Sequence, residues 1–261
     1  MLLSIRFLHF LPLFALLLFG PVSCLGSAPA GASQAIAKPD HQRWTQLLQK
    51  HVAADGDVDY KGMKQDRKEL QLYLNQLSKG VPDPKTWSRE EQLAYWINAY
   101  NAYTVKLIVD NYPLKSIKDL NATVSVPLVN TIWDDKFIKL GGKEYSLNDI
   151  EHRILRKEFD EPRIHFAVNC ASKSCPKLSR EAYTASKLEK QLEEQTLGFI
   201  NDPKHNRITP DNPKVSAIFD WFGGDFKKKG SLTDFINRYS KVKIKPGANI
   251  TFLDYDWNLN E

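Results

Sequence analysis

One segment near the middle of the chain most constrains the fold. It reads LAYWINAYNAYTVKLIV over residues 93–109. Ser88 precedes it, and Glu91 follows Ser88 by three residues, which is the capping-box pattern of a helix start. Pro113 ends it because proline cannot continue a helix. Since the segment is apolar on nearly every side, we expect a helix buried at the centre of the fold.

Two asparagines lie within this apolar helix. Asn98 and Asn101 are three residues apart and therefore share one face. A buried amide without partners costs about 1–3 kcal/mol, so each must form specific hydrogen bonds. Two interpretations stay open: the amides hold the backbone of a neighbouring loop, or one of them orients a catalytic histidine.

The rest of the chain alternates short helical and strand patterns. Further helices are expected over residues 41–51, 64–78, 147–158, 187–200 and 232–239, with Ser146 and Ser186 at the starts of two of them. Strands are expected over residues 163–170, 241–245 and 251–259, and a β-hairpin over residues 137–146. This pattern predicts an α+β fold in which a helix-rich N-terminal half packs on a small, mainly antiparallel sheet.

The N-terminus predicts export. Arg6 and His9 precede the apolar run LPLFALLLFG, which is too short to span a membrane. Small residues follow in the pattern of a cleavage site, so the segment has the form of a secretory signal peptide. We therefore expect a periplasmic or secreted protein without a transmembrane span in its mature form. Cys24 leaves a lipid anchor, and hence a lipoprotein, as the alternative.

A single globular unit is expected after the N-terminal segment. Residues 1–37 cover the signal peptide and a tether, residues 38–84 a helical N-terminal extension, and residues 85–261 the main domain, which forms one unit with the extension. The chain carries 36 Lys and Arg against 31 Asp and Glu, for a net charge of +5. Because the two signs are interspersed, the sequence lacks the basic patch of a nucleic-acid-binding protein.

The segment HFAVNCASKSCP, residues 165–176, holds the residue types best suited to chemistry. A zinc site needs four ligands, but Cys170, Cys175 and His165 have no second ligand cluster downstream. We therefore expect neither a metal nor a cofactor. Export would leave the two cysteines in an oxidising compartment, which favours a disulfide between them.

A catalytic thiol is the alternative interpretation of the same segment. A cysteine nucleophile reacts as the thiolate and needs a paired histidine. Along a regular strand, His165 and Cys170 would point to opposite faces. Either the strand ends or bulges before Cys170, or His165 serves a partner elsewhere, such as Asn98 or Asn101. His152 is interpreted as a surface or packing residue.

Several motifs occur in a fixed order along the chain. They are AYWINAYNAY, SLNDIEHRILR, RIHFAVNCASKSCPKL, AIFDWFGGDF and FLDYDWNLN. Together they resemble the domain-of-unknown-function 547 family of exported bacterial proteins, from about residue 85 to the C-terminus. The residues that fall in the family's motifs are Asn98, Asn101, Glu151, His165, Cys170, Cys175, Asp220 and Trp221. The resemblance implies no catalytic role for any of them.

Two functions from different classes are therefore weighed, and whether the protein is an enzyme stays open. The first is a binding or interaction module, stapled by Cys170–Cys175, for a peptide, glycan or protein partner. Asp220 and Trp221 are its candidate ligand-binding residues. Aromatic rings and carboxylates mixed in this way suit such ligands. The further members of that mixture are Asp225, Asp254, Asp256 and Trp257.

The second function is a thiol-dependent hydrolase or acyl transferase of the papain or transglutaminase type. It would use Cys170 and His165, with Asn98 and Asn101 as candidate orienting residues. In this sequence the cysteine follows the predicted strand, whereas such enzymes carry it at a helix start. This difference favours the binding module.

Overall fold

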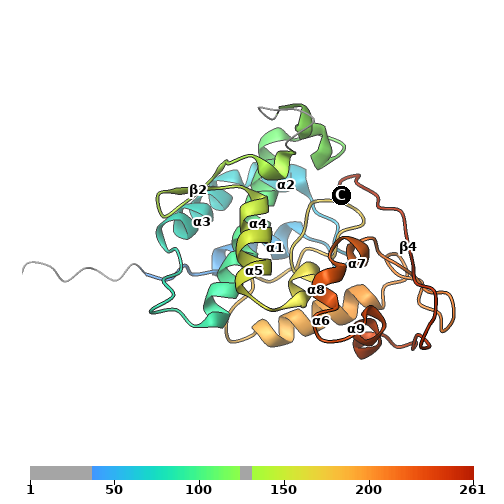
Figure 1. The fold of residues 1–261 in the computed structure, drawn as a ribbon. Coiled ribbons are helices and arrows are strands. Elements are labelled where there is room, and N and C mark those ends of the chain that lie inside the picture. The colour runs from blue at the N-terminus through green and yellow to red at the C-terminus, as the bar shows by residue number, and fades with distance from the viewer. Residues whose placement is uncertain (1–36, 124–130) are drawn as a thin grey trace, which may run out of the picture. The chain divides into compact units, whose positions relative to one another are not determined.

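The computed structural model describes residues 37–123 and 131–261 (Figure 1). This part of the chain forms one compact unit. The predicted signal peptide and the candidate lipidation site at Cys24 lie outside the described residues. No helix in the described ranges is long and apolar enough to cross a membrane.

Helices are the main regular structure of this unit. The α-helices are α1 (Gln42–His51), α2 (Tyr60–Gln65), α3 (Arg67–Lys79), α4 (Arg89–Asn111), α5 (Arg156–Glu158), α6 (Leu188–Ile200), α7 (Ile218–Trp221), α8 (Gly223–Phe226) and α9 (Leu232–Tyr239). The other helical segments are the 3-10 helices η1 (Ile117–Thr123), η2 (Ile132–Asp134) and η4 (Pro162–Phe166), and the π-helix η3 (Asp149–Leu155).

Strands in the described residues pair only two by two. The expected hairpin is β1 (Ile138–Leu140) antiparallel to β2 (Lys143–Tyr145). A second pair joins β3 (Lys214–Val215) to β4 (Thr251–Phe252) in parallel. The predicted α+β class is confirmed, with helices dominating the N-terminal half and a very small sheet content.

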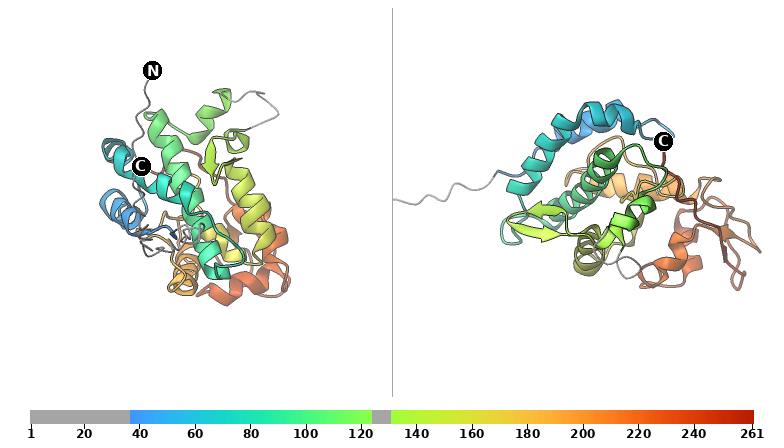
Figure 2. Two further views of the ribbon diagram at one scale, coloured as in Figure 1. Left: turned by 90° about the vertical axis from the view of Figure 1, so that its left-hand side faces the viewer. Right: turned by 90° about the horizontal axis from the view of Figure 1, so that it is seen from above.

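Helix α4 lies at the centre, as its apolar sequence predicts. The Ser88 hydroxyl accepts a hydrogen bond from the Glu91 N–H at 3.2 Å, and the Glu91 carboxylate accepts one from the Ser88 N–H at 2.8 Å. Every residue from Leu93 to Val105 is buried. The helix contacts α2, α3 and η3, and Figure 2 shows it between the N-terminal helices and the later part of the chain. The predicted central helix and its capping box are confirmed.

The apolar interior has two parts that meet at η4. The first surrounds α4 and includes Ile164. The second surrounds Phe166, whose ring lies 5.2 Å from Phe199, 5.8 Å from Phe219 and 5.6 Å from Phe226, measured between ring centroids. Because Ile164 and Phe166 belong to different clusters, η4 is packed on both sides.

The predicted strand over residues 163–170 is wrong. The chain forms η4 there, followed by a turn. Pro162 presets the first turn, and the Glu161 carboxylate accepts a hydrogen bond from the Arg163 N–H at 3.1 Å. Residues 164–169 are all buried, so the alternation of a half-buried strand is absent. Packing between two apolar clusters thus overrides the local strand propensity.

Other predicted elements form with changes. The helix expected over residues 147–158 is the π-helix η3 continued by α5, with the Asp149 N–H donating to the Ser146 hydroxyl at 3.0 Å. The strand expected over residues 241–245 is absent from the described structure, and the one over 251–259 is reduced to β4. The capping box at Ser186 does not form, because the Glu189 carboxylate binds Arg163 instead.

Candidate functional site

A cavity of about 170 Å³ lies beside the segment 165–176. Its aromatic lining comprises Tyr100, Trp133, Trp221, Phe222, Tyr255 and Trp257. Its titratable lining comprises Glu151, His152 and His165, and the two cysteines lie at its wall. These residues come from distant parts of the sequence, so the cavity exists only in the folded protein.

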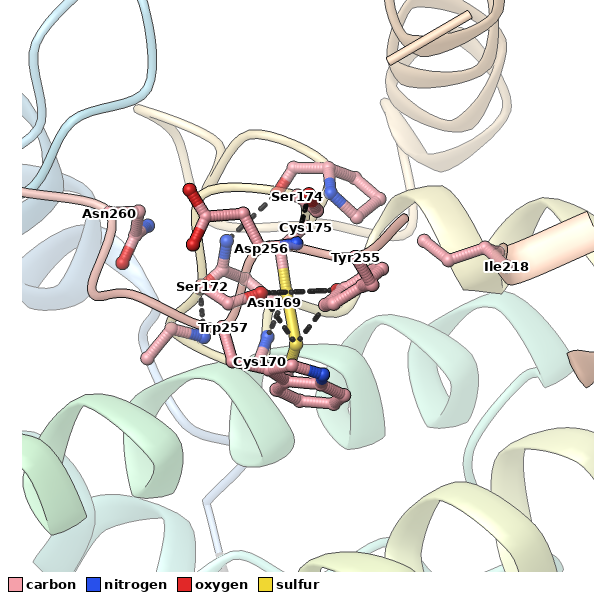
Figure 3. Close-up of a disulfide and its surroundings, with 12 residues drawn as sticks. Asn169, Cys170, Ser172, Ser174, Cys175, Ile218, Tyr255, Asp256, Trp257 and Asn260 are labelled. Atoms are coloured by element: carbon pink, nitrogen blue, oxygen red, sulfur yellow. Dashed lines mark hydrogen bonds between the residues drawn. A yellow bond between two sulfur atoms is a disulfide. The ribbon is translucent and has the colours of Figure 1, made fainter. Parts of the chain in front are cut away.

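Cys170 and Cys175 form a disulfide (Figure 3). The Tyr255 hydroxyl lies 3.3 Å from each of the two sulfur atoms. The Ser172 hydroxyl donates to the Tyr255 hydroxyl oxygen at 3.1 Å. The sulfur atoms are therefore in contact with a side chain from the C-terminal segment.

The C-terminal segment also binds the backbone of the disulfide loop. The Lys173 N–H donates to the Asn258 carbonyl at 2.8 Å, and the Ser174 N–H donates to the Asp256 carbonyl at 3.2 Å. In return, the Asp256 N–H donates to the Ser174 hydroxyl at 2.9 Å. These bonds place Tyr255 against the disulfide, as Figure 3 shows.

Asn101 holds the entrance of the loop from inside the protein. Its Nδ2 donates to the Ala167 carbonyl at 2.9 Å, and its Oδ1 accepts from the Asn169 N–H at 2.9 Å. Asn169 in turn donates to the Pro176 carbonyl at 2.8 Å and accepts from the Ala171 N–H at 2.8 Å. The last bond fixes Ala171 at a φ of 59°, a backbone conformation that costs an L-residue energy.

Asn98 makes the same kind of contact one turn earlier in α4. It donates to the Tyr183 carbonyl at 2.7 Å and accepts from the Tyr183 N–H at 2.9 Å. In the described part of the chain, no hydrogen bond joins Asn98 or Asn101 to His165. Both amides make contacts with loop backbone.

His165 binds a carboxylate from α8. Its Nε2 lies 2.9 Å from Oδ2 of Asp225, and the same oxygen accepts a hydrogen bond from Nε of Arg156 at 2.6 Å. The imidazole stacks on Phe222 with centroids 4.0 Å apart, and Nδ1 is buried without a hydrogen-bond partner among the described residues.

Burial sets the charge state of this pair. Desolvation lowers the pKa of His165, and the hydrogen bond to Asp225 opposes that effect only in part. Burial raises the pKa of Asp225, but the hydrogen bonds from His165 and Arg156 outweigh it and hold that pKa well below its usual range. The pair therefore consists of a neutral imidazole and an ionised carboxylate near neutral pH.

Glu151 brings a second buried carboxylate to the cavity. It lies on the π-helix η3, and π-turns recur at functional sites because they reposition side chains. Its carboxylate lies close enough to the Tyr100 hydroxyl to add to the rise in the pKa of Tyr100, which burial causes in the first place. The sequence marks Glu151 only as part of a motif, without showing that it is buried.

The aromatic side of the cavity is a cluster of indole and phenol rings. Tyr255 lies 4.7 Å from Trp221 and 4.6 Å from Trp257, measured between ring centroids. Trp133 packs against Trp257 at 5.6 Å. Trp221 keeps 48% of its surface exposed, although it is a large hydrophobic residue. The ammonium of Lys118 lies 3.9 Å above the Trp257 ring.

The structure brings some of the predicted site residues together and leaves others apart. His165, Cys170, Cys175, Trp221 and Trp257 all line the cavity, and Asp225 contacts it through His165. The predicted residues that are exposed and do not line it are Asp220, Asp254 and Asp256.

The sequence did not identify several of the residues that line the cavity. His152 is exposed, as expected, but it also lines the cavity, and its Nδ1 lies 3.0 Å from Nη1 of Arg156. Tyr100 is a polar group on the same buried helix, but it lies two residues from Asn98 and one from Asn101 and therefore does not share their face, so the spacing of the asparagines does not identify it. In the described residues, no group of three His, Cys, Asp or Glu side chains could hold a metal ion.

A comparison with protein families supports the resemblance for the middle of the chain. The model of the family "Protein of unknown function, DUF547" matches residues 84–200. The resemblance predicted from the sequence is therefore confirmed over the segment from α4 to α6, which includes the disulfide loop. No curated protein and no solved structure matches the chain. The matched segment does not include the C-terminal residues that complete the cavity.

Proposed function

We propose that the protein is an exported, disulfide-stapled binding module that takes a ligand in the cavity between the disulfide loop and the C-terminal segment. The observation that carries the proposal is the aromatic lining around Trp221, which is half-exposed beside buried polar groups. Concave sites with an aromatic lining and a few placed polar groups are typical ligand sites. The ligand would be a peptide, a glycan or an exposed part of a protein partner.

The disulfide supports a binding role over a catalytic one. Both sulfurs are engaged in one bond, so neither is a thiolate that could attack a substrate. The bond instead closes the loop on which Tyr255 packs. A rigid loop lowers the entropy lost on binding, which is a benefit to a binding site.

Export is part of the proposal and rests on the N-terminal sequence. The pattern of a signal peptide and a disulfide between the remaining cysteines both suit an oxidising compartment, either the periplasm or the exterior. A lipoprotein anchored at Cys24 is the alternative within the same compartment.

Peptide and glycan arrays probed with the purified protein test the binding role. The wild type is expected to retain at least one class of probe, and Trp221→Ala to bind it about tenfold more weakly, since one lost ring contact costs about 1.4 kcal/mol. Phe252→Ala removes a similarly exposed ring outside the cavity and is expected to bind as the wild type does. Failure to retain any probe, or undiminished binding by Trp221→Ala, would contradict the proposal.

A thiol-dependent hydrolase or acyl transferase is the second candidate. The hydrogen bond between His165 and Asp225 favours it, because a carboxylate that orients an imidazole is a recurring part of such sites. Cys170 lines the same cavity as His165, and reduction by an external thiol would free it.

Alkylation decides between the two candidates. In Cys175→Ser, Cys170 is a free thiol, and its rate of reaction with iodoacetamide can be compared with that of free cysteine. The binding module predicts an equal or slower rate, unchanged by the additional substitution His165→Gln. A faster rate that requires His165 would favour the enzyme.

A further inference from the structure

Glu151 is a buried carboxylate that has no Lys or Arg partner among the described residues. It keeps only 7% of its surface exposed. The arginines of the same segment are engaged elsewhere, Arg153 with Asp149 and Arg156 with Asp225. Among residues 37–123 and 131–261, no Lys or Arg side chain forms an ion pair with Glu151.

The neighbours of Glu151 do not neutralise it. Tyr100 brings an uncharged hydroxyl close to the carboxylate. His165 is close enough for its charge state to respond to Glu151, but burial keeps the imidazole neutral. A buried charge without a counter-charge is costly, so the site would gain from a bound cation.

Besides a counter-charge, a site for an organic cation gains from aromatic rings, and the aromatic cluster provides them. The faces of indole and phenol rings attract ammonium groups, most strongly where water is excluded. Lys118 shows this within the chain, since its ammonium lies 3.9 Å above the Trp257 ring. Trp133, Trp221 and Tyr255 present further rings at the same cavity.

The size of the cavity limits the ligand. At about 170 Å³ it is smaller than the roughly 300–1,000 Å³ of pockets that enclose whole small molecules. It therefore suits a side-chain-sized group with an apolar stem and a charged end.

We propose that the cavity binds an organic ammonium group, with Glu151 as its counter-ion and the rings of Trp221 and Trp257 against its alkyl stem. This inference rests on the proposed binding function and narrows its ligand to a chemical class. The group could be carried by a lysine side chain of a peptide or by an amino sugar.

Calorimetric titration with matched probes tests the inference. Nα-acetyl-lysine amide is compared with the uncharged Nα-acetyl-norleucine amide, and a glucosamine disaccharide with its N-acetylated form, at a mildly acidic pH that protonates both amines. We expect at least one charged probe to bind ten or more times tighter than its neutral counterpart. The pair that shows this difference identifies the carrier of the ammonium group.

Variants assign the effect to Glu151. Glu151→Gln keeps the shape of the side chain without its charge and is expected to reduce the charged-to-neutral ratio to about twofold or less. Glu158→Gln, an exposed carboxylate at the end of α5, should leave the ratio unchanged. If Glu151→Gln does not fold, the ratio of charged to neutral probe binding in the wild type decides whether the ammonium inference holds.

The outcomes separate this inference from the proposed function. Equal binding of charged and neutral probes, lost in Trp221→Ala, would overturn the ammonium inference and leave the cavity as a binding site. Binding of charged probes that Glu151→Gln does not weaken would also overturn it. The binding function itself would be overturned only by the negative results of the array experiment described above.

Discussion

At the scale of single residues, Asn101 determines how the disulfide loop is held. Its amide replaces the hydrogen-bonding partner that a neighbouring strand would give to Ala167 and Asn169. The sequence predicts that Asn98 and Asn101 need specific partners, because buried amides do. It cannot say which partners, because they lie 66 to 85 residues away along the chain.

Asn101→Ala is expected to lower the free energy of unfolding by about 2–6 kcal/mol. The substitution leaves a buried carbonyl and a buried N–H without partners, at about 1–3 kcal/mol each. Urea denaturation measures the loss. Asn111→Ala is the control, since that exposed amide bonds only within its own helix, and its effect should stay below about 1 kcal/mol. Similar losses in both variants would contradict the role of Asn101.

His165 is expected to make the protein less stable in mild acid. Its pKa is lowered from 6.5 by burial, so below about pH 6.5 the unfolded chain takes up a proton that the folded protein does not. The stability that His165 contributes is therefore complete above that pH and is lost as the pH falls. The lowered pKa of Asp225 adds a further loss below about pH 3.8.

Urea unfolding between about pH 8 and pH 5 measures this dependence. The wild type should lose up to about 1.4 kcal/mol per pH unit from His165, and His165→Gln should lose correspondingly less. His152→Gln, at an exposed histidine, should keep the wild-type slope. Parallel profiles for the wild type and His165→Gln would contradict the assignment.

At the scale of elements, local signals predicted the helices better than the strands. Helix α4 begins at the serine cap that the sequence displays, α9 spans the predicted residues Leu232–Tyr239, and the hairpin turns at adjacent glycines. The segment 163–170 has strand-forming residues but is enclosed by two apolar clusters, which no local pattern reveals. Burial on all sides therefore explains the wrong assignment there.

The two serine caps predicted from the same motif should differ in effect. Ser88→Ala removes a formed capping box and is expected to cost about 1 kcal/mol of unfolding free energy. Ser186→Ala touches an exposed residue outside α6 and should cost almost nothing. Thermal or urea unfolding compares them. An equal cost would mean that Ser186 caps its helix after all.

At the scale of the whole molecule, the site depends on contacts between distant segments. The sequence predicts the disulfide and the aromatic character of the C-terminal segment. It does not predict that Tyr255 reaches the sulfurs, that Asp225 binds His165 or that Glu151 is buried beside them. These contacts arise from the packing of the C-terminal segment on the loop, and sequence spacing carries no information about them.

Removal of the disulfide should weaken the fold by a modest amount. The double variant Cys170→Ser with Cys175→Ser is expected to lose roughly 2 kcal/mol of unfolding free energy, the entropy of closing so short a loop. The wild type with added dithiothreitol should behave like the variant, and the variant should not respond to dithiothreitol. A wild type equally stable with and without dithiothreitol would contradict a stabilising bond.

Intact mass spectrometry tests the central claim most directly. The protein is isolated from its host and denatured in the presence of iodoacetamide, without reductant. A stapled, exported module predicts a chain shortened at its N-terminus, with no alkylation at Cys170 or Cys175. After reduction, the same sample should gain an alkyl group at each of the two cysteines. Two alkylated cysteines without prior reduction would contradict the account, because Cys170 would then be a free thiol beside His165.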